Sequence, residues 1–565
     1  MLDKIRSIYI VNRIFDFIKN KRKLKIIRYS KKFQKSLNIA KKDFKVYELL
    51  QEFNQKYKTD IDDIDIFELD LTDKKLGNEG LNSLFKIEFK NLSSLTLCDN
   101  EITNINIFAK EKFKNLKDLD LGDNRITDIK VLEKAKFEDL EELYFDNNQI
   151  SNIDILAKVN LKKLKILNFR ENKISNINVL EKVDFKDLEE IDLATNPIVN
   201  IDVLKNADFK KLKELTFKYY NLKDVNILKE VDFPELTTLS LSSCDIKSID
   251  FLQQVNFKNL EILYLSANKI SDINILEKVN FKELKELYLG RMYGVSDFKF
   301  LEKVNFSKLN ILYLGTNDIT NINFLEKANF KELEELDLNH NKIKDINVFA
   351  KVKFPKLKNL ILNNNKISNI NVLEKAQFPK LEILDLDYNN ISNINVLKNV
   401  NFNELKELHF NLNKIANINV LEKVNFKELK VLNLYSNNSK NINVLEKVNF
   451  KKLQSLNLGD NKISDIKALE KVNFEELNSL DLSSNQISDI NVLEKVKFGK
   501  LKELDLSFNS IKDINVFNKT NFKDLNKLNL RHNNIYQKEY SSVIDKLEKD
   551  VEEFDIDIVI DIFKK

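Results

Sequence analysis

Apolar residues recur along this chain at a regular spacing. The segment 477–498, LNSLDLSSNQISDINVLEKVKF, shows the pattern L-x-x-L-x-L-x-x-N-x-I-x-x-I-x-V-L-x-x-V-x-F-x-x, whose positions we number 1 to 24 from the first Leu. This Leu occurs 19 times from Leu92 to Leu525. Each copy begins 24 residues after the one before it, as Leu501 follows Leu477, except that the interval from Leu284 to Leu309 is longer by a single residue. A hydrophobic template repeated this often predicts a solenoid in which each repeat packs on its neighbours.

Each repeat is expected to contain one short strand and one short helix. The alternating Leu residues at positions 4 and 6 predict the strand, and stacked copies predict a parallel sheet with one buried face. In the second half, Asn491 is followed by Glu494 at capping-box spacing. We therefore expect about one helical turn there, with Leu493 and Val496 pointing inward.

The two ends of the chain depart from the template. Residues 1–60 predict a helical N-terminal module, and residues 61–535 predict a solenoid of about 20 repeats. The first repeat is irregular, because LTDKKLGNEGLNSL predicts a short helix in place of the usual turn. Residues 536–565 predict a C-terminal cap with a helix over 536–553 and a strand over 554–563, which would cover the last open edge of the sheet.

Two polar and aromatic positions also recur. Position 9 is Asn in 16 of the 19 copies, and the exceptions are Tyr220, Cys244 and Met292. An Asn side chain there is expected to bond backbone groups of its own turn and of the next repeat, so removing one would cost roughly 1–3 kcal/mol. Position 22 is Phe in 17 of 18 units, Leu161 being the exception, which predicts a stacked spine on the convex side.

The motif L-x-x-L-x-L-x-x-N-x-I resembles the leucine-rich repeat over residues 66 to about 535. This resemblance implies an α/β solenoid, a horseshoe with a parallel concave β-sheet and one-turn helices on the convex side. The paired Ile positions resemble the short-repeat subclass of internalins and phosphatase regulators. The resemblance further implies a protein-binding scaffold that is not an enzyme, and a phosphatase-regulator role is one alternative.

Charges are unevenly distributed over the template. The outward strand and turn positions 3, 5, 7 and 8 carry 20 acids against five bases, although the whole chain has a formal net charge of +4. A face of about −15 would repel phosphate backbones and attract a basic protein partner. The alternative is that solvated acids only keep a large sheet soluble.

Aromatic residues cluster in the copies whose sequence departs from the repeat template. Position 5 is Tyr in three successive copies, Tyr264, Tyr288 and Tyr313, and position 3 beside them is Ile262 or Ile311. Tyr and Arg dominate interface hot spots, so we predict a partner-binding patch, which also includes residues of neighbouring turns: Tyr219, Tyr220, Arg291 and Tyr293. The alternative is repeat drift, with Tyr chosen for its strand propensity.

Residues 10–33 resemble an F-box, without its opening Leu-Pro and with Phe33 where a Trp is common. The resemblance implies that Ile14, Phe15, Ile18 and Leu24 would contact a Skp-type adaptor of a cullin ubiquitin ligase, with the repeats selecting the substrate. A plain helical cap explains the same apolar residues. Because residues 1–60 carry a net charge of +11, binding of nucleic acid or a membrane surface is a further alternative.

No catalytic, cofactor or metal motif is expected. The sequence contains no GK[ST], G-x-G-x-x-G, C-x-x-C or H-E-x-x-H pattern, and its three His residues are His340, His409 and His532. We therefore predict neither a cofactor nor a small-molecule substrate. The chain begins without a signal-peptide pattern, has no membrane-length apolar run, and carries only two Cys, so a cytoplasmic location is expected. Ser439, at a core Ile position, is expected to be a local weak spot.

Overall fold

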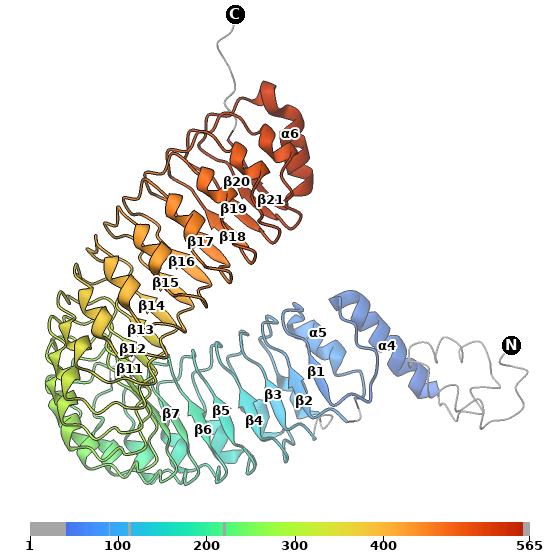
Figure 1. Ribbon diagram of the computed structural model, residues 1–565. Helices are drawn as coiled ribbons and strands as arrows, with labels where there is room; N and C mark the ends of the chain where they lie inside the picture. The colour runs from blue at the N-terminus through green and yellow to red at the C-terminus, as the bar shows by residue number, and fades with distance from the viewer. Residues whose placement is uncertain (1–40, 90, 111–114, 219–221, 558–565) are drawn as a thin grey trace, which may run out of the picture. The chain divides into compact units, whose positions relative to one another are not determined.

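The computed structural model describes residues 41–89, 91–110, 115–218 and 222–557, and these residues form two compact units that divide after Leu260. Both units repeat one arrangement, a three-residue strand followed by a turn and a short 3-10 helix on the opposite side (Figure 1). Each unit is therefore a solenoid with a parallel sheet, as predicted, but its helical turns are 3-10 helices and not α-helices.

The first unit contains two α-helices, α4 Lys41–Tyr57 and α5 Gly77–Leu84, and eight strands. The strands are β1 Glu68–Asp70, β2 Ser94–Thr96, β3 Asp118–Asp120, β4 Glu142–Tyr144, β5 Ile166–Asn168, β6 Glu190–Asp192, β7 Glu214–Thr216 and β8 Thr238–Ser240. The 3-10 helices are η2 Asn106–Ala109, η3 Lys130–Glu133, η4 Asp154–Lys158, η5 Asn178–Glu181, η6 Asp202–Asn206, η7 Asn226–Lys229 and η8 Asp250–Gln253. Each strand pairs in parallel with the next.

The second unit continues the pattern with thirteen strands and a C-terminal helix, α6 Gln537–Asp550. The strands are β9 Ile262–Tyr264, β10 Glu286–Tyr288, β11 Ile311–Tyr313, β12 Glu335–Asp337, β13 Asn359–Ile361, β14 Ile383–Asp385, β15 Glu407–His409, β16 Val431–Asn433, β17 Ser455–Asn457, β18 Ser479–Asp481, β19 Glu503–Asp505, β20 Lys527–Asn529 and β21 Glu553–Asp555. The 3-10 helices are η9 Asn274–Lys278, η10 Lys299–Glu302, η11 Asn323–Glu326, η12 Asn347–Ala350, η13 Asn371–Lys375, η14 Asn395–Asn399, η15 Asn419–Lys423, η16 Asn443–Lys447, η17 Lys467–Glu470, η18 Asn491–Glu494 and η19 Asn515–Asn518.

The core follows the apolar template. In the repeat that starts at Leu357, the buried apolar residues are Leu357, Leu360, Leu362, Ile367, Ile370, Val372, Leu373, Ala376 and Phe378. Pairing keeps equivalent Leu residues opposite one another, and Leu287 still faces Leu312 across the one-residue insertion. The extra residue is therefore absorbed in the loop after β10, where Gly294 has a φ of +90° that only glycine adopts easily.

The predicted Asn ladder is present, but it reaches the preceding repeat and not the next one. Asn365 Nδ2 donates to Leu338 O at 2.9 Å and to Leu362 O at 3.1 Å, while its Oδ1 accepts the Ile343 N–H at 3.0 Å. Leu338 and Ile343 both belong to the repeat before Asn365. The side chain thus pairs backbone groups that burial removes from water.

The predicted capping box is wrong. The N-cap residue of η18 is Ile490, and the Asn491 N–H donates to Asp489 Oδ1 at 3.0 Å. An Asn, Asp or Ser two residues before the helix start does the same elsewhere, as with Asn369 and Asn371. Val492 and Leu493 are the buried residues of this turn and Val496 is only half-buried, so the predicted inward pair is half right.

Both described ends carry helices that close the solenoid. Helix α4 packs on α5, where a methyl group on Gly80 would lie 3.1 Å from Tyr57 Cε1, and Leu50 and Phe53 are buried. Helix α5 lies in the stretch predicted to be a short helix. At the other end α6 forms as predicted, but the strand after it is only Glu553–Asp555, and Ile556 and Asp557 already lie outside it. Residues 558–563 of the predicted strand fall outside the described residues.

Candidate functional site

The second unit brings the three predicted position-5 tyrosines together on the outward face of its sheet. The rings of Tyr264 and Tyr288 stack with centroids 4.4 Å apart and an interplanar angle of 18°, and Tyr288 and Tyr313 lie 6.1 Å apart at 37°. The Tyr288 hydroxyl donates to Glu286 Oε2 at 2.9 Å. Burial and this carboxylate raise the pKa of Tyr288 above its usual range, so the ring stays neutral.

Two isoleucines and one glycine complete this tyrosine stack. In the register of the sheet, Glu286 lies between Ile262 and Ile311, both half-buried. The ring of Tyr313 lies against Gly290, where an added methyl group would be 2.3 Å from its Cε1 atom. We call Ile262, Tyr264, Tyr288, Ile311 and Tyr313 the tyrosine patch.

Two other predicted residues, Arg291 and Tyr293, do not belong to this patch. They follow β10 and line a separate groove of about 970 Å³. Tyr219 and Tyr220 lie outside the described residues, as do Ile14, Phe15, Ile18 and Leu24 of the F-box-like segment. The structure therefore divides the predicted patch between two surfaces of the second unit.

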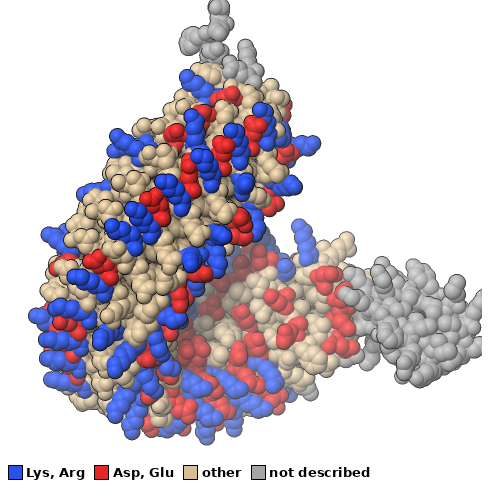
Figure 2. All heavy atoms as spheres, viewed as in Figure 1, with Lys and Arg blue, Asp and Glu red and all other residues tan. Residues whose placement is uncertain are grey.

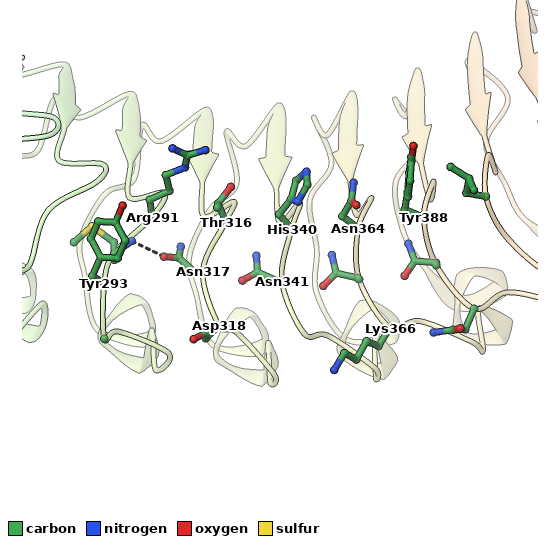
Figure 3. Close-up of a pocket in the computed structure, with 16 residues that line it drawn as sticks. Arg291, Tyr293, Thr316, Asn317, Asp318, His340, Asn341, Asn364, Lys366 and Tyr388 are labelled. Atoms are coloured by element: carbon green, nitrogen blue, oxygen red, sulfur yellow. Dashed lines mark hydrogen bonds between the residues drawn. The ribbon is translucent and has the colours of Figure 1, made fainter. Parts of the chain in front are cut away.

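The groove, which we call the rim groove, crosses six successive repeats. Figure 3 shows Arg291, Thr316, His340, Asn364 and Tyr388 in one row, with the ladder residues Asn317 and Asn341 in the row beneath it. All residues of the upper row occupy position 8. No sequence pattern singled out His340, Lys366 or Tyr388, although Tyr388 is a bulky residue at a position that is often small or polar.

Position 8 has an unusual backbone conformation. In all 18 described copies its φ lies between 48° and 58°, and none of these residues is glycine. The left-handed conformation aims the N–H at the next repeat, as where Thr316 N donates to Asn339 O at 2.8 Å. The inter-repeat bonds hold a conformation that most side chains avoid, and they point the position-8 side chains toward the groove.

The carboxylates at position 5 also accept hydrogen bonds from the turn that follows the strand. This corrects the interpretation from the sequence, which treated them only as negative charges on the outward face. Each of the six accepts the backbone N–H two residues later, as Asp481 does from Ser483 at 2.9 Å. The full set is Asp120, Asp192, Asp337, Asp385, Asp481 and Asp505. These side chains therefore end each strand by bonding the following turn.

Three carboxylates gather on the sheet face over β12 to β14. Burial raises the pKa of Asp337 to about 6, and burial together with the neighbouring Asp385 raises the pKa of Asp387 to about 6. Burial also raises the pKa of Asp385. Asp337 and Asp387 are therefore mainly ionised at neutral pH but lose charge on mild acidification.

On other faces of the solenoid, Lys and Glu side chains of successive repeats form rows of ion pairs. Lys358 Nζ lies 2.6 Å from Glu334 Oε2, and Lys500 Nζ lies 2.7 Å from Glu476 Oε1. Figure 2 shows such rows as alternating blue and red side chains along the repeats. Exposed pairs of this kind stabilise little individually.

Among the described residues, no group of three or more His, Cys, Asp or Glu side chains could hold a metal ion. Within the same part of the chain, no helix is both long and apolar enough to cross a membrane. Cys98 is half-buried, and burial with nearby carboxylates raises the pKa of its thiol to about 12. It is therefore a poor nucleophile.

Models of leucine-rich repeats match several stretches of the chain: two-copy repeats at residues 90–134, 138–182, 234–278 and 451–495, a leucine-rich repeat at 331–391 and another at 500–514. No curated protein matches.

Solved structures share the fold. The TLR13–ssRNA13 complex gives 24% identity and a TM-score of 0.57 over 83% of this chain and 74% of that one. The mouse RP105/MD-1 complex gives 18% identity and a TM-score of 0.54 over 85% and 88%. An internalin of Listeria monocytogenes gives 20% identity over 80% and 89%, but a TM-score of 0.26, so the predicted subclass stays a prediction. With its regular repeats, strand-by-strand register and matches to leucine-rich-repeat models, the chain is a leucine-rich-repeat solenoid.

Proposed function

We propose that this chain is a protein-recognition scaffold whose second unit binds a basic protein segment on its sheet face. The observation that carries the proposal is the tyrosine patch on β9–β11, followed directly by the carboxylates of β12–β14. Tyrosine rings offer a large contact area with little rotamer entropy to lose, and the acids attract cations.

Three amide oxygens without a hydrogen bond lie close to the carboxylates of the same unit. The Oδ1 atoms of Asn339, Asn363 and Asn411 are buried and accept no hydrogen bond within the described residues. All three occupy position 7, next to the carboxylates. Lysine and arginine side chains carry three and five N–H donors and no acceptor, so they match the charge of the neighbouring carboxylates.

The structural position of the patch argues against repeat drift alone. Tyr288 is held on both sides, by the stacked ring of Tyr264 and by the carboxylate of Glu286. Ordered aromatic side chains presented on an outward face lose little entropy on binding. A cytoplasmic location, a Skp-type adaptor and a phosphatase-regulator role stay predictions.

Site-specific photocrosslinking in the native cell tests the proposal. A benzoylphenylalanine in place of Ile262 is expected to crosslink a partner through a Lys- or Arg-rich peptide, identified by mass spectrometry. The control carries the same group in place of Lys375, an exposed residue of η13. Equal labelling from both positions, or crosslinked peptides that are predominantly acidic, would contradict the proposal.

A further inference from the structure

The rim groove differs chemically from the sheet face. Its floor is formed by ladder residues whose amides are already occupied, since Asn341 Nδ2 donates to Leu314 O at 3.0 Å and its Oδ1 accepts the Ile319 N–H at 3.0 Å. A ligand must therefore be recognised by the side chains along the edges of the groove. Those side chains come from positions 8 and 10 of successive repeats.

The uncommitted charges in the rim groove are positive. Arg291 and Lys366 form no ion pair within the part of the chain that the structure describes. Asp318 is the one carboxylate among the lining residues, and it is paired with Lys342 at 2.8 Å. Two cations next to a neutralised carboxylate favour an anionic ligand, the opposite of what the sheet face favours.

Exposed aromatic rings lie near both ends of the groove. Tyr293 is 61% exposed and follows Arg291, while Tyr388 is 48% exposed and lies one repeat beyond Lys366. Tyrosine is enriched at protein–protein interfaces relative to the rest of the surface. Rings on either side of two cations are suited to a chain that is both acidic and partly apolar.

The spacing fits an extended peptide. Arg291 and Lys366 lie three repeats apart, which is about 14 Å at a strand spacing of about 4.8 Å. An extended peptide rises about 3.3 Å per residue, so two acidic residues about four positions apart would meet the two cations. Six repeats of groove would accommodate about seven residues.

We propose that the rim groove binds an extended, acidic peptide segment of another protein, whose carboxylates pair with Arg291 and Lys366 and whose apolar side chains contact Tyr293 and Tyr388. This second surface is independent of the tyrosine patch and takes a ligand of opposite charge. One scaffold thus offers sites for two segments of different chemistry.

Fluorescence anisotropy on the full chain tests this proposal. The probe is a pool of fluorescein-labelled nonapeptides with Glu at the third and seventh positions and random residues elsewhere, and a second pool has Lys at both positions. The intact protein is expected to bind the Glu pool in preference to the Lys pool. The variant Arg291→Glu with Lys366→Glu is expected to bind the Glu pool about tenfold more weakly and to gain affinity for the Lys pool.

The matched control, Lys344→Glu with Lys375→Glu, changes the net charge equally at exposed residues outside the groove and is expected to bind as the intact protein does. If the control lost as much affinity for the Glu pool, the effect would be one of general charge, and the proposal would be overturned. No saturable binding of the Glu pool up to about 1 mM would also overturn it. Preferential, Arg291-dependent binding of single-stranded oligonucleotide over the Glu pool would replace the peptide by a nucleic acid.

Discussion

The ring of Tyr313 rests on Gly290, so close that a single methyl group on Gly290 would lie 2.3 Å from ring atom Cε1. Gly290 occupies position 7 of one repeat and Tyr313 occupies position 5 of the next. The missing side chain at Gly290 therefore sets the ring orientation at the end of the tyrosine patch. This dependence makes the patch testable without altering any tyrosine.

Gly290→Ala is expected to push the Tyr313 ring off its present orientation and to weaken binding of a basic partner by roughly tenfold, because a hot-spot contact typically contributes more than about 1 kcal/mol. The measurement is affinity together with the urea unfolding midpoint. Gly499→Ala is the matched control, since a methyl group there meets nothing within 4 Å. Equal affinities of the two variants would show that the ring orientation is irrelevant.

Asp337→Asn is expected to stabilise the second unit at pH 7.5 by on the order of 1–3 kcal/mol. The pKa of Asp337 is raised to about 6 from 3.8, so the native state binds the proton more tightly than the unfolded chain. The stability from this group is complete below about pH 4 and is lost as pH rises through 6. Asn removes the buried charge and keeps the acceptor for the Asn339 N–H.

Urea unfolding at pH 7.5 and at pH 4.5 measures this effect. The gain from Asp337→Asn should shrink markedly at the lower pH, where the native carboxyl is already protonated. A gain of the same size at both values, or a loss at pH 7.5, would show that the charge of Asp337 is not the cause.

Asn365→Ala is expected to destabilise the second unit by about 1–3 kcal/mol, because it leaves the Ile343 N–H and the Leu338 and Leu362 carbonyls without this partner. Hydrogen exchange should show the loss concentrated in adjacent repeats, which depend only on nearest neighbours. The control is Asn425→Ala, whose exposed amide bonds only the Asn403 side chain. A cost below about 0.5 kcal/mol for Asn365→Ala would mean that the ladder is dispensable.

Ser439→Ile is expected to stabilise the solenoid by about 1 kcal/mol, because the added apolar burial outweighs the hydrogen bond that is lost. Ser439 is fully buried at a position where Ile415 and Ile463 lie in the neighbouring repeats, and its hydroxyl donates only a 3.3 Å bond to Ile415 O. The measurement is the urea unfolding midpoint. A lower midpoint would indicate instead that the space around Ser439 has collapsed and cannot accept the larger side chain.

The sequence predicted most of the scaffold because the scaffold depends on repetition. The constant spacing of the template places each Leu, Ile and Phe opposite its equivalent, so burial and strand register followed directly. The tyrosine patch was predictable for the same reason, since residues at one template position stack when no register shift intervenes. This held even across the insertion between Leu284 and Leu309.

The sequence did not indicate the rim groove, because the groove depends on the direction of the backbone after each strand. Position 8 is occupied by residues as different as Leu412, Phe508 and Thr195, all with positive φ and none with a residue type that suggests it. The inter-repeat hydrogen bonds that impose this conformation are tertiary. Arg291 and Tyr293 were therefore predicted in one patch with the tyrosines, although the turn carries them to the rim groove.

The central claim is that the tyrosine patch binds a protein partner, and quantitative recovery of that partner tests it most directly. The tagged chain and its Tyr264→Ser, Tyr288→Ser, Tyr313→Ser triple variant are expressed in the native cell, with Tyr536→Ser as a control at an exposed tyrosine outside the patch. The proteins recovered with each are then quantified by mass spectrometry. We predict that the main basic partner falls about tenfold with the triple variant and is unchanged with the control, whereas unchanged recovery with a correctly folded triple variant would contradict the claim.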